Sequence, residues 1–176
     1  MGKLFKDKKN LALFFSISVV LALVWMYAFT GSPRGVSEPA QPSGDIFISG
    51  QTVSNKNLSL SDYPNTVIII DFWATWCPPC VAEIPHFVEL QNKYGSKGLQ
   101  IIGISLDKDI SLIPPFIKDK NINYPIVLGT TLSEKGFGKV TSIPTTFILD
   151  RNHKIIKKIV GYKPIEFFES IINPLL

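Results

Sequence analysis

A pair of cysteines at the junction of a predicted strand and a predicted helix constrains this chain more than any other feature. Residues 67–70 form a Val-Ile-Ile-Ile run, which indicates a buried strand. A short segment leads from this run to Cys77 and Cys80, and apolar residues at helical spacing follow directly. Unpaired N–H groups at a helix N-terminus stabilise a thiolate, and Pro78 and Pro79 fit a first helical turn, where their missing N–H groups cost nothing. The pattern therefore predicts a disulfide that opens and closes.

Metal binding and a static disulfide are the structural alternatives for these cysteines. A structural zinc site needs four ligands, whereas the chain has only two cysteines, and His86 and His153 lack a ligand spacing. We therefore predict no metal site, and we interpret His86 as a helix surface residue and His153 as a turn residue. A disulfide that closes so short a loop adds little stability, which disfavours a purely structural role. A copper-binding chaperone that uses both cysteines and a distant histidine is a weaker alternative.

The segment that contains the cysteines resembles the active-site signature of the thioredoxin superfamily, Asp-Phe-Trp-Ala-x-Trp-Cys-x-Pro-Cys. Pro85 matches the helix-kinking proline of that superfamily, and the segment Ile143-Pro144-Thr-Thr-Phe resembles its cis-proline loop. Glu83 and the N-terminal apolar segment resemble the TlpA/ResA-like branch, which comprises membrane-tethered, extracytoplasmic thiol-disulfide oxidoreductases. The resemblance implies a thioredoxin-like α/β fold: a mixed central sheet with helices on both faces, an N-terminal transmembrane helix and a short N-terminal hairpin.

The resemblance also implies a role for each residue near the sulfurs. Cys77 is the expected nucleophile that attacks a substrate disulfide, and Cys80 is expected to resolve the mixed disulfide. Asp71 matches the buried acid of thioredoxins, whose raised pKa allows proton exchange near neutral pH. Glu83 matches the acidic residue of the TlpA/ResA-like branch. Because the chain has both carboxyls, which of them relays protons stays open.

The expected substrate-binding residues surround the cysteines. Pro144 is expected to follow a cis peptide bond that places the backbone of Ile143 beside the sulfurs, where it can pair with an extended client. Trp76 is expected to form an apolar docking face. Pro78 and Pro79, which lie between the cysteines, complete the predicted binding surface.

The implied partners are protein thiol or disulfide clients and a membrane thiol-reducing electron donor. Clients of the family include apocytochrome c during haem attachment and thiols of copper sites. We expect a monomer that needs no cofactor beyond its two cysteines and acts as a reductant. A disulfide-introducing oxidase is the alternative within the same fold, although such proteins usually carry a larger helical insertion. Residues 45–176 hold 13 basic and 12 acidic side chains, so nothing in their charge favours nucleic acid as a partner.

The N-terminal part of the sequence predicts a membrane anchor. Residues 1–10 form a basic tail, and residues 11–29 form a run of 19 residues without a charge. At ~1.5 Å per residue this run approaches the ~30 Å of a hydrocarbon core, and the preceding lysines favour a cytoplasmic N-terminus. A cleaved signal peptide is the alternative, and both interpretations export the rest of the chain. Residues 30–44 are rich in Pro, Ser and Gly and predict a flexible linker to the thioredoxin-like domain at 45–176.

Hydrophobic periodicity and turn residues predict the remaining elements of the domain. Thr131 and Glu134 form a capping-box pattern, which predicts a brief helix that ends at Gly136 or Gly138. The other expected elements are a hairpin over 45–49 and 58–60, a helix from the cysteines to Gly95, a strand over 99–106, a helix that begins near Pro114, a short strand over 124–128, an antiparallel pair over 145–150 and 154–161, and a closing helix after Pro164.

Overall fold

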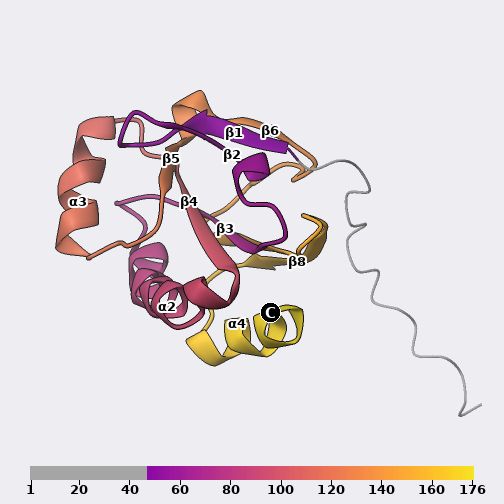
Figure 1. The fold of residues 1–176 in the computed structure, drawn as a ribbon. Helices are drawn as coiled ribbons and strands as arrows, with labels where there is room; N and C mark the ends of the chain where they lie inside the picture. The colour runs from indigo at the N-terminus through magenta and orange to yellow at the C-terminus, as the bar shows by residue number, and fades with distance from the viewer. Residues whose placement is uncertain (1–46) are drawn as a thin grey trace, which may run out of the picture. The chain divides into compact units, whose positions relative to one another are not determined.

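The computed structural model describes residues 47–176, which are built around a five-stranded mixed sheet with the strand order β5-β4-β3-β7-β8 (Figure 1). The three strands β3, β4 and β5 run parallel to one another, while β7 is antiparallel to β3 and β8 is antiparallel to β7. The five strands are β3 (Val67–Trp73), β4 (Leu99–Ser105), β5 (Ile126–Leu128), β7 (Thr145–Leu149) and β8 (Ile155–Val160).

The central strand β3 is buried along its whole length, as the Val-Ile-Ile-Ile run predicts. Strand β4 pairs with it on one side and β7 on the other, so that Asp71 lies opposite Gly103 and Thr146. A strand that is covered on both faces is expected to be continuously apolar, because neither face meets water. Asp71 is therefore the exception within β3, and its position marks it as a candidate for chemistry.

Three α-helices cover one face of the sheet, which we call the helix face. They are α2 (Pro78–Tyr94), α3 (Ile113–Asp119) and α4 (Ile165–Ile172). Their apolar side chains, such as Phe87 of α2, Ile113 of α3 and Phe168 of α4, pack into one cluster with Ile69 and Trp73 of β3. The crossovers from β3 to β4 and from β4 to β5 proceed in the same direction along the sheet. Because such crossovers are right-handed, α2 and α3 lie on the same face.

A second, three-stranded sheet covers the opposite face, which we call the support face (Figure 1). Its strands are β1 (Phe47–Gln51), β2 (Asn57–Ser59) and β6 (Ser133–Lys135). Ile48 of β1 and Leu58 of β2 pack with Phe72, Phe137 and Phe147 in a separate apolar cluster. Within residues 47–176, the prediction of helices on both faces is therefore wrong, because short strands rather than α-helices fill the support face.

The capping-box pattern at Thr131 does not start a helix. The Thr131 hydroxyl oxygen instead accepts the Gln51 N–H at 2.9 Å and donates to the Leu128 carbonyl at 3.0 Å. Strand β6 follows and pairs with β1, with Ser133 opposite Ser49. The predicted brief helix is therefore wrong, because pairing with a distant strand outweighs a local helix signal.

The other local predictions within the described residues are confirmed. Strands β1 and β2 form the predicted hairpin, α2 ends at Tyr94 beside Gly95, and α3 begins next to Pro114. The predicted strands over 99–106 and 124–128 correspond to β4 and β5, β7 and β8 form the antiparallel pair, and α4 follows Pro164. Single-turn 3-10 helices fill several connections: η1 (Leu60–Asp62), η2 (Gly95–Lys97), η3 (Ile110–Leu112), η4 (Gly129–Thr131) and η5 (Asn173–Leu175).

The predicted transmembrane segment at 11–29, with its basic tail and linker, lies outside the described residues. Within 47–176, none of the helices has both the length and the apolar character that crossing a membrane requires.

Candidate redox site

Cys77 and Cys80 form a disulfide where β3 gives way to α2. Their Cα atoms lie 5.3 Å apart. Cys77 is the N-cap residue of α2, and its sulfur accepts the Cys80 N–H at 3.3 Å. The sulfurs are recessed, since Cys77 is 4% exposed and Cys80 is fully buried. The predicted placement of both cysteines at a helix N-terminus is thus confirmed. Because Pro78 and Pro79 have no N–H, the Cys80 N–H and the helix dipole are what stabilise a thiolate on Cys77.

The turn before Cys77 is held by Asp107, which follows the end of β4. The Asp107 side chain is 3% exposed, and its carboxyl accepts hydrogen bonds from both the N–H and the hydroxyl of Thr75. The Ser105 hydroxyl donates to the same carboxyl at 2.8 Å. Because β3 and β4 are parallel, their carboxyl ends meet at one edge of the sheet, and this geometry brings Asp107 to the redox turn.

Asp71 lies on the helix face of β3 and is 1% exposed. Its contact with a hydroxyl is long, since the Thr146 hydroxyl donates to Oδ1 at 3.5 Å. Burial raises the pKa of Asp71 well above its ordinary value, and the nearby charge of Glu83 raises it further. The Thr146 hydrogen bond offsets only part of this effect. Burial therefore favours the protonated form of Asp71.

Glu83 lies one helical turn beyond Cys80 on α2 and is fully buried. Its Oε1 accepts the Lys163 N–H at 2.7 Å, whereas its Oε2 has no hydrogen-bond partner among the described residues. Burial raises the pKa of Glu83 to about 7, against the lowering effects of the Lys163 N–H and the Lys163 charge. This carboxyl therefore changes protonation state near neutral pH, and it is not an ordinary solvated helix glutamate.

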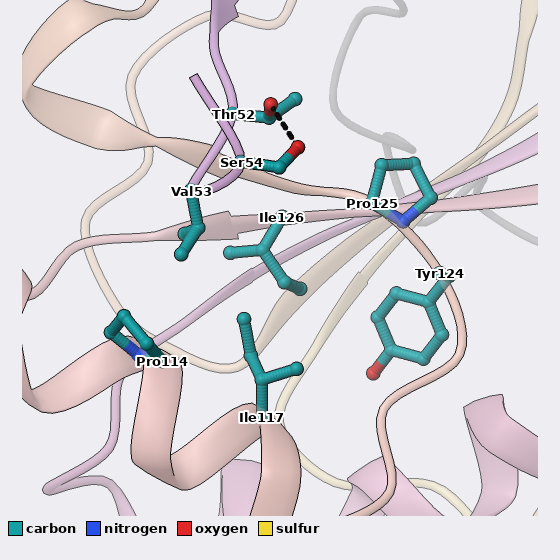
Figure 2. Close-up of a pocket in the computed structure, with 8 residues that line it drawn as sticks. All are labelled: Thr52, Val53, Ser54, Pro114, Ile117, Tyr124, Pro125 and Ile126. Atoms are coloured by element: carbon teal, nitrogen blue, oxygen red, sulfur yellow. Dashed lines mark hydrogen bonds between the residues drawn. The ribbon is translucent and has the colours of Figure 1, made fainter. Parts of the chain in front are cut away.

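Tyr124 lies near the buried carboxyls of Asp71 and Glu83 and also lines a cavity of about 310 Å³ at the β5 edge of the sheet. Burial raises the pKa of the Tyr124 hydroxyl well above its ordinary value, and the charges of Asp71 and Glu83 add to the effect. The ring packs closely over Gly103, where a Cβ atom would lie 3.4 Å from Tyr124 Cε2. Figure 2 shows the cavity between the β1–β2 turn, α3 and the start of β5; it is lined by Thr52, Val53, Ser54, Pro114, Ile117, Tyr124, Pro125 and Ile126.

The peptide bond between Ile143 and Pro144 is cis, as predicted. The Pro144 carbonyl accepts the Gly161 N–H at 2.8 Å, and two residues later the Lys163 N–H binds Glu83. The segment 161–163 thus joins the cis-proline loop to the helix that carries Cys80.

Two aromatic contacts complete the surroundings of the site. The His86 ring lies 5.6 Å from that of Tyr162, and its Nδ1 donates to the Lys163 carbonyl at 3.3 Å. His86 therefore helps to hold the 161–163 segment against α2. Trp76 is 66% exposed beside Cys77 and is available as an apolar docking face, whereas Trp73 is buried in the helix-face core against Phe116.

Comparisons with known proteins identify the family of this chain. Residues 38–174 match the family model described as Redoxin. The chain belongs to the Redoxin family. A thiol-disulfide oxidoreductase ResA of Bacillus cereus is 29% identical to this redoxin over 123 residues, which cover 70% of this chain and 71% of that protein. ResA of Bacillus subtilis (strain 168) is 25% identical over 160 residues, which cover 88% of each chain.

Solved structures show the same likeness. A thiol:disulfide interchange protein of the thioredoxin family from Chlorobium tepidum TLS has a TM-score of 0.66 and 29% identity, and the match covers 77% of this chain and 97% of that one. StoA of Bacillus subtilis has a TM-score of 0.57 and 26% identity, with 75% and 98% covered. Together with the disulfide, these matches make this redoxin a thiol-disulfide oxidoreductase of the TlpA/ResA-like thioredoxin superfamily.

Four of the predicted site residues of this redoxin lie on the helix face of the sheet, namely Cys77, Cys80, Asp71 and Glu83. Sequence reasoning missed Asp107 and Tyr124, and it missed the Lys163 N–H as the partner of Glu83. Asp107 had a usable signal, because an acid directly after a strand parallel to the cysteine strand lies at the same sheet edge. Among the described residues, no three His, Cys, Asp or Glu side chains lie close enough to hold a metal ion.

Proposed function

We propose that this redoxin reduces protein disulfides outside the cytoplasm. The observation that carries the proposal is the pair of buried carboxyls, Asp71 and Glu83, on the same face of the sheet as the sulfurs. In its charged form either carboxyl opposes thiolate formation on a nearby cysteine, and a destabilised dithiol form makes the cysteine pair a stronger reductant. Strong oxidants on this scaffold instead stabilise their reduced form.

The proposed reaction moves two electrons and two protons to the client. The Cys77 thiolate attacks one sulfur of the client disulfide, so that the client S–S bond breaks, a mixed disulfide forms and one client thiolate leaves. The Cys80 thiolate then attacks the Cys77 sulfur, which releases the second client thiolate and forms the Cys77–Cys80 disulfide. Both client thiolates take up protons, so that the client is reduced and the redoxin is oxidised.

Glu83 is the proposed proton relay for Cys80. Its pKa of about 7 matches the working pH, and a general base is most effective under that condition. Burial raises the pKa of Asp71 well above its ordinary value and so favours its protonated form, which makes Glu83 the proposed base. The unpartnered Oε2 of Glu83 is free to accept the thiol proton, directly or through one water.

The equilibrium reduction potential of the full-length protein, measured against glutathione or dithiothreitol, tests this direction of electron flow. We expect a value near that of thioredoxin, about −270 mV, because of the acidic surroundings. A value near that of DsbA, about −120 mV, would instead support disulfide introduction, the alternative activity on this fold.

The proposed setting is the outer side of the cell membrane, with residues 11–29 as a single-pass anchor and the N-terminus in the cytoplasm. A monomer would draw electrons from a membrane thiol-reducing partner and pass them to clients such as apocytochrome c or the thiols of a metal site. Protease treatment of spheroplasts should degrade the domain of an exported protein, whereas a domain that is protected until the cells are lysed would contradict the proposal. The mass of the mature protein distinguishes the two interpretations of the N-terminal segment, because an anchor is retained whereas a signal peptide is removed.

A further inference from the structure

The turn that presents Cys77 is tied to β4 by side-chain bonds as well as by its own backbone. Thr75 lies two residues before Cys77; its hydroxyl donates to Asp107 Oδ1 at 2.6 Å, and its N–H donates to Asp107 Oδ2 at 3.0 Å. The Ser105 hydroxyl holds the carboxyl from the other side, and the Ser105 oxygen accepts the Asp107 N–H at 3.2 Å. A backbone bond from the Leu106 N–H to the Trp73 carbonyl, 2.8 Å long, closes the same junction.

These bonds fix the position of the attacking sulfur. The Cys77 N–H donates to the Ala74 carbonyl at 3.2 Å, so residues 74–77 form one closed turn, and Thr75 lies inside it. All hydrogen bonds made by the Asp107 oxygens are accepted ones, which is the bonding of an acceptor-only carboxylate. With 3% of its surface exposed, Asp107 has little contact with screening salt.

We propose that Asp107 is a positioning residue that sets the dithiol–disulfide equilibrium of Cys77 and Cys80. Two effects act in the same direction. A fixed turn keeps Cys77 within reach of Cys80 and so favours the closed disulfide through a high effective concentration. The nearby carboxylate also opposes a thiolate on Cys77 and disfavours the reduced form. Asp107 therefore makes the pair a stronger reductant. The proposal rests on Cys77 and Cys80 being the redox pair of the proposed function.

The test compares Asp107→Asn and Asp107→Ala with the wild type in the full-length protein. We expect the equilibrium with glutathione to shift toward the dithiol by about tenfold, which corresponds to about 30 mV for this two-electron couple. The rate of Cys77 alkylation by iodoacetamide should reach its plateau at lower pH. Thr75→Val, which removes only the hydroxyl donor, should shift the equilibrium in the same direction by about threefold, the usual worth of one hydrogen bond.

Asp109→Asn is the matched control. Asp109 lies two residues away and also binds a serine, since its carboxyl accepts the Ser111 N–H and hydroxyl, but it has no hydrogen bond to the redox turn. Removing its charge should leave both the glutathione equilibrium and the alkylation profile unchanged.

The possible outcomes distinguish a positioning role of Asp107 from a purely structural one. A purely structural residue would lower the stability of the oxidised and reduced forms equally, so an unchanged glutathione equilibrium in both Asp107 variants would overturn the proposal. If neither Asp107 variant folds, Thr75→Val decides, and an unchanged equilibrium in that variant also overturns it. A wild-type protein that fails to exchange with glutathione would instead sink the proposed function.

Discussion

The two faces of the main sheet are built from the same strands but have different contents. In β3, Asp71 faces the helices, while its neighbours Ile70 and Phe72 face the support sheet. The helix face carries the disulfide and two buried carboxyls, whereas the support-face cluster of described side chains is apolar. The centre of this cluster is a set of edge-to-face aromatic rings, and the ring centroids of Phe137 and Phe147 lie 5.0 Å apart. Because side chains of β3 alternate between the two faces, the redox residues lie on one face and the apolar support cluster on the other. Substitutions on the helix face should therefore change redox activity, and substitutions on the support face should change the free energy of unfolding.

The largest expected effect is the loss of disulfide reduction in Cys77→Ser. The hydroxyl is a poor nucleophile, so turnover of an insulin or peptide disulfide should fall to the uncatalysed rate while the fold is retained. Cys80→Ala is the informative partner variant, because it retains the nucleophile and should accumulate mixed disulfides with clients. Residual turnover in Cys77→Ser, measured by the release of client thiols, would mean that another group attacks first.

Phe147→Ala should produce the opposite pattern. Removing a fully packed ring from the support face leaves a cavity, so the free energy of unfolding should fall by about 3–5 kcal/mol. Chemical denaturation measures this loss. The reduction potential should stay at the wild-type value, and a shift in potential would show that the two faces are coupled. Phe47→Ala, at a position that is 45% exposed, is the matched control and should change stability by no more than about 0.5 kcal/mol.

Glu83→Gln tests the acid–base role on the helix face. Without an ionisable group, the rate of client reduction should fall by about a hundredfold, and the inflection of the rate near pH 7 should disappear. The wild-type rate should rise with pH through this inflection, because the base must be deprotonated. Glu89→Gln on the same helix is the control, since Glu89 is exposed. An unchanged inflection in Glu83→Gln would assign the relay to another group.

The same glutamate should make stability depend on pH. The pKa of Glu83 is about 7 in the folded protein and 4.5 as an ordinary carboxyl, so between these values the folded state holds a proton that the unfolded chain has released. The free energy of unfolding should therefore fall as pH rises through this interval, and the contribution is lost above about 7. Urea unfolding across this range should show a smaller decrease of the free energy of unfolding with pH in Glu83→Gln. The decrease that remains in this variant is assigned to Asp71. An equal slope in both proteins would contradict the assigned shift.

The smallest effect is expected at the outer edge of the helix face, where α2 meets α4. Lys93 and Glu169 form an ion pair 2.7 Å long, with the Lys93 side chain half exposed. Exposed ion pairs contribute little, so Lys93→Met should lower the free energy of unfolding only slightly and by far less than Phe147→Ala. Thermal unfolding at low and high salt measures this change, and a larger loss would show that the Tyr94 hydroxyl, which also binds Glu169, depends on the pair.

Sequence alone was enough to predict the parts that depend on local patterns. The β3 strand and the cysteines at the start of α2 follow from residue types at fixed spacing, and the family resemblance implies the cis bond before Pro144; the structure confirms all three. The failures are all long-range. Thr131 had a local helix signal, but the segment after it pairs with β1 instead. Asp107, 32 residues from Thr75, becomes part of the redox turn only through the sheet.

The recessed position of Cys77 also restricts which clients can react. With only 4% of the residue in contact with solvent, a client disulfide must reach the recessed Cys77 sulfur with its own S–S bond in line with the attacking thiolate. A disulfide on the surface of a rigid, folded protein lacks the freedom to reach this position, whereas one on a flexible or unfolded chain has it. We therefore expect this redoxin to reduce disulfides of flexible or unfolded chains faster than those of compact, folded proteins.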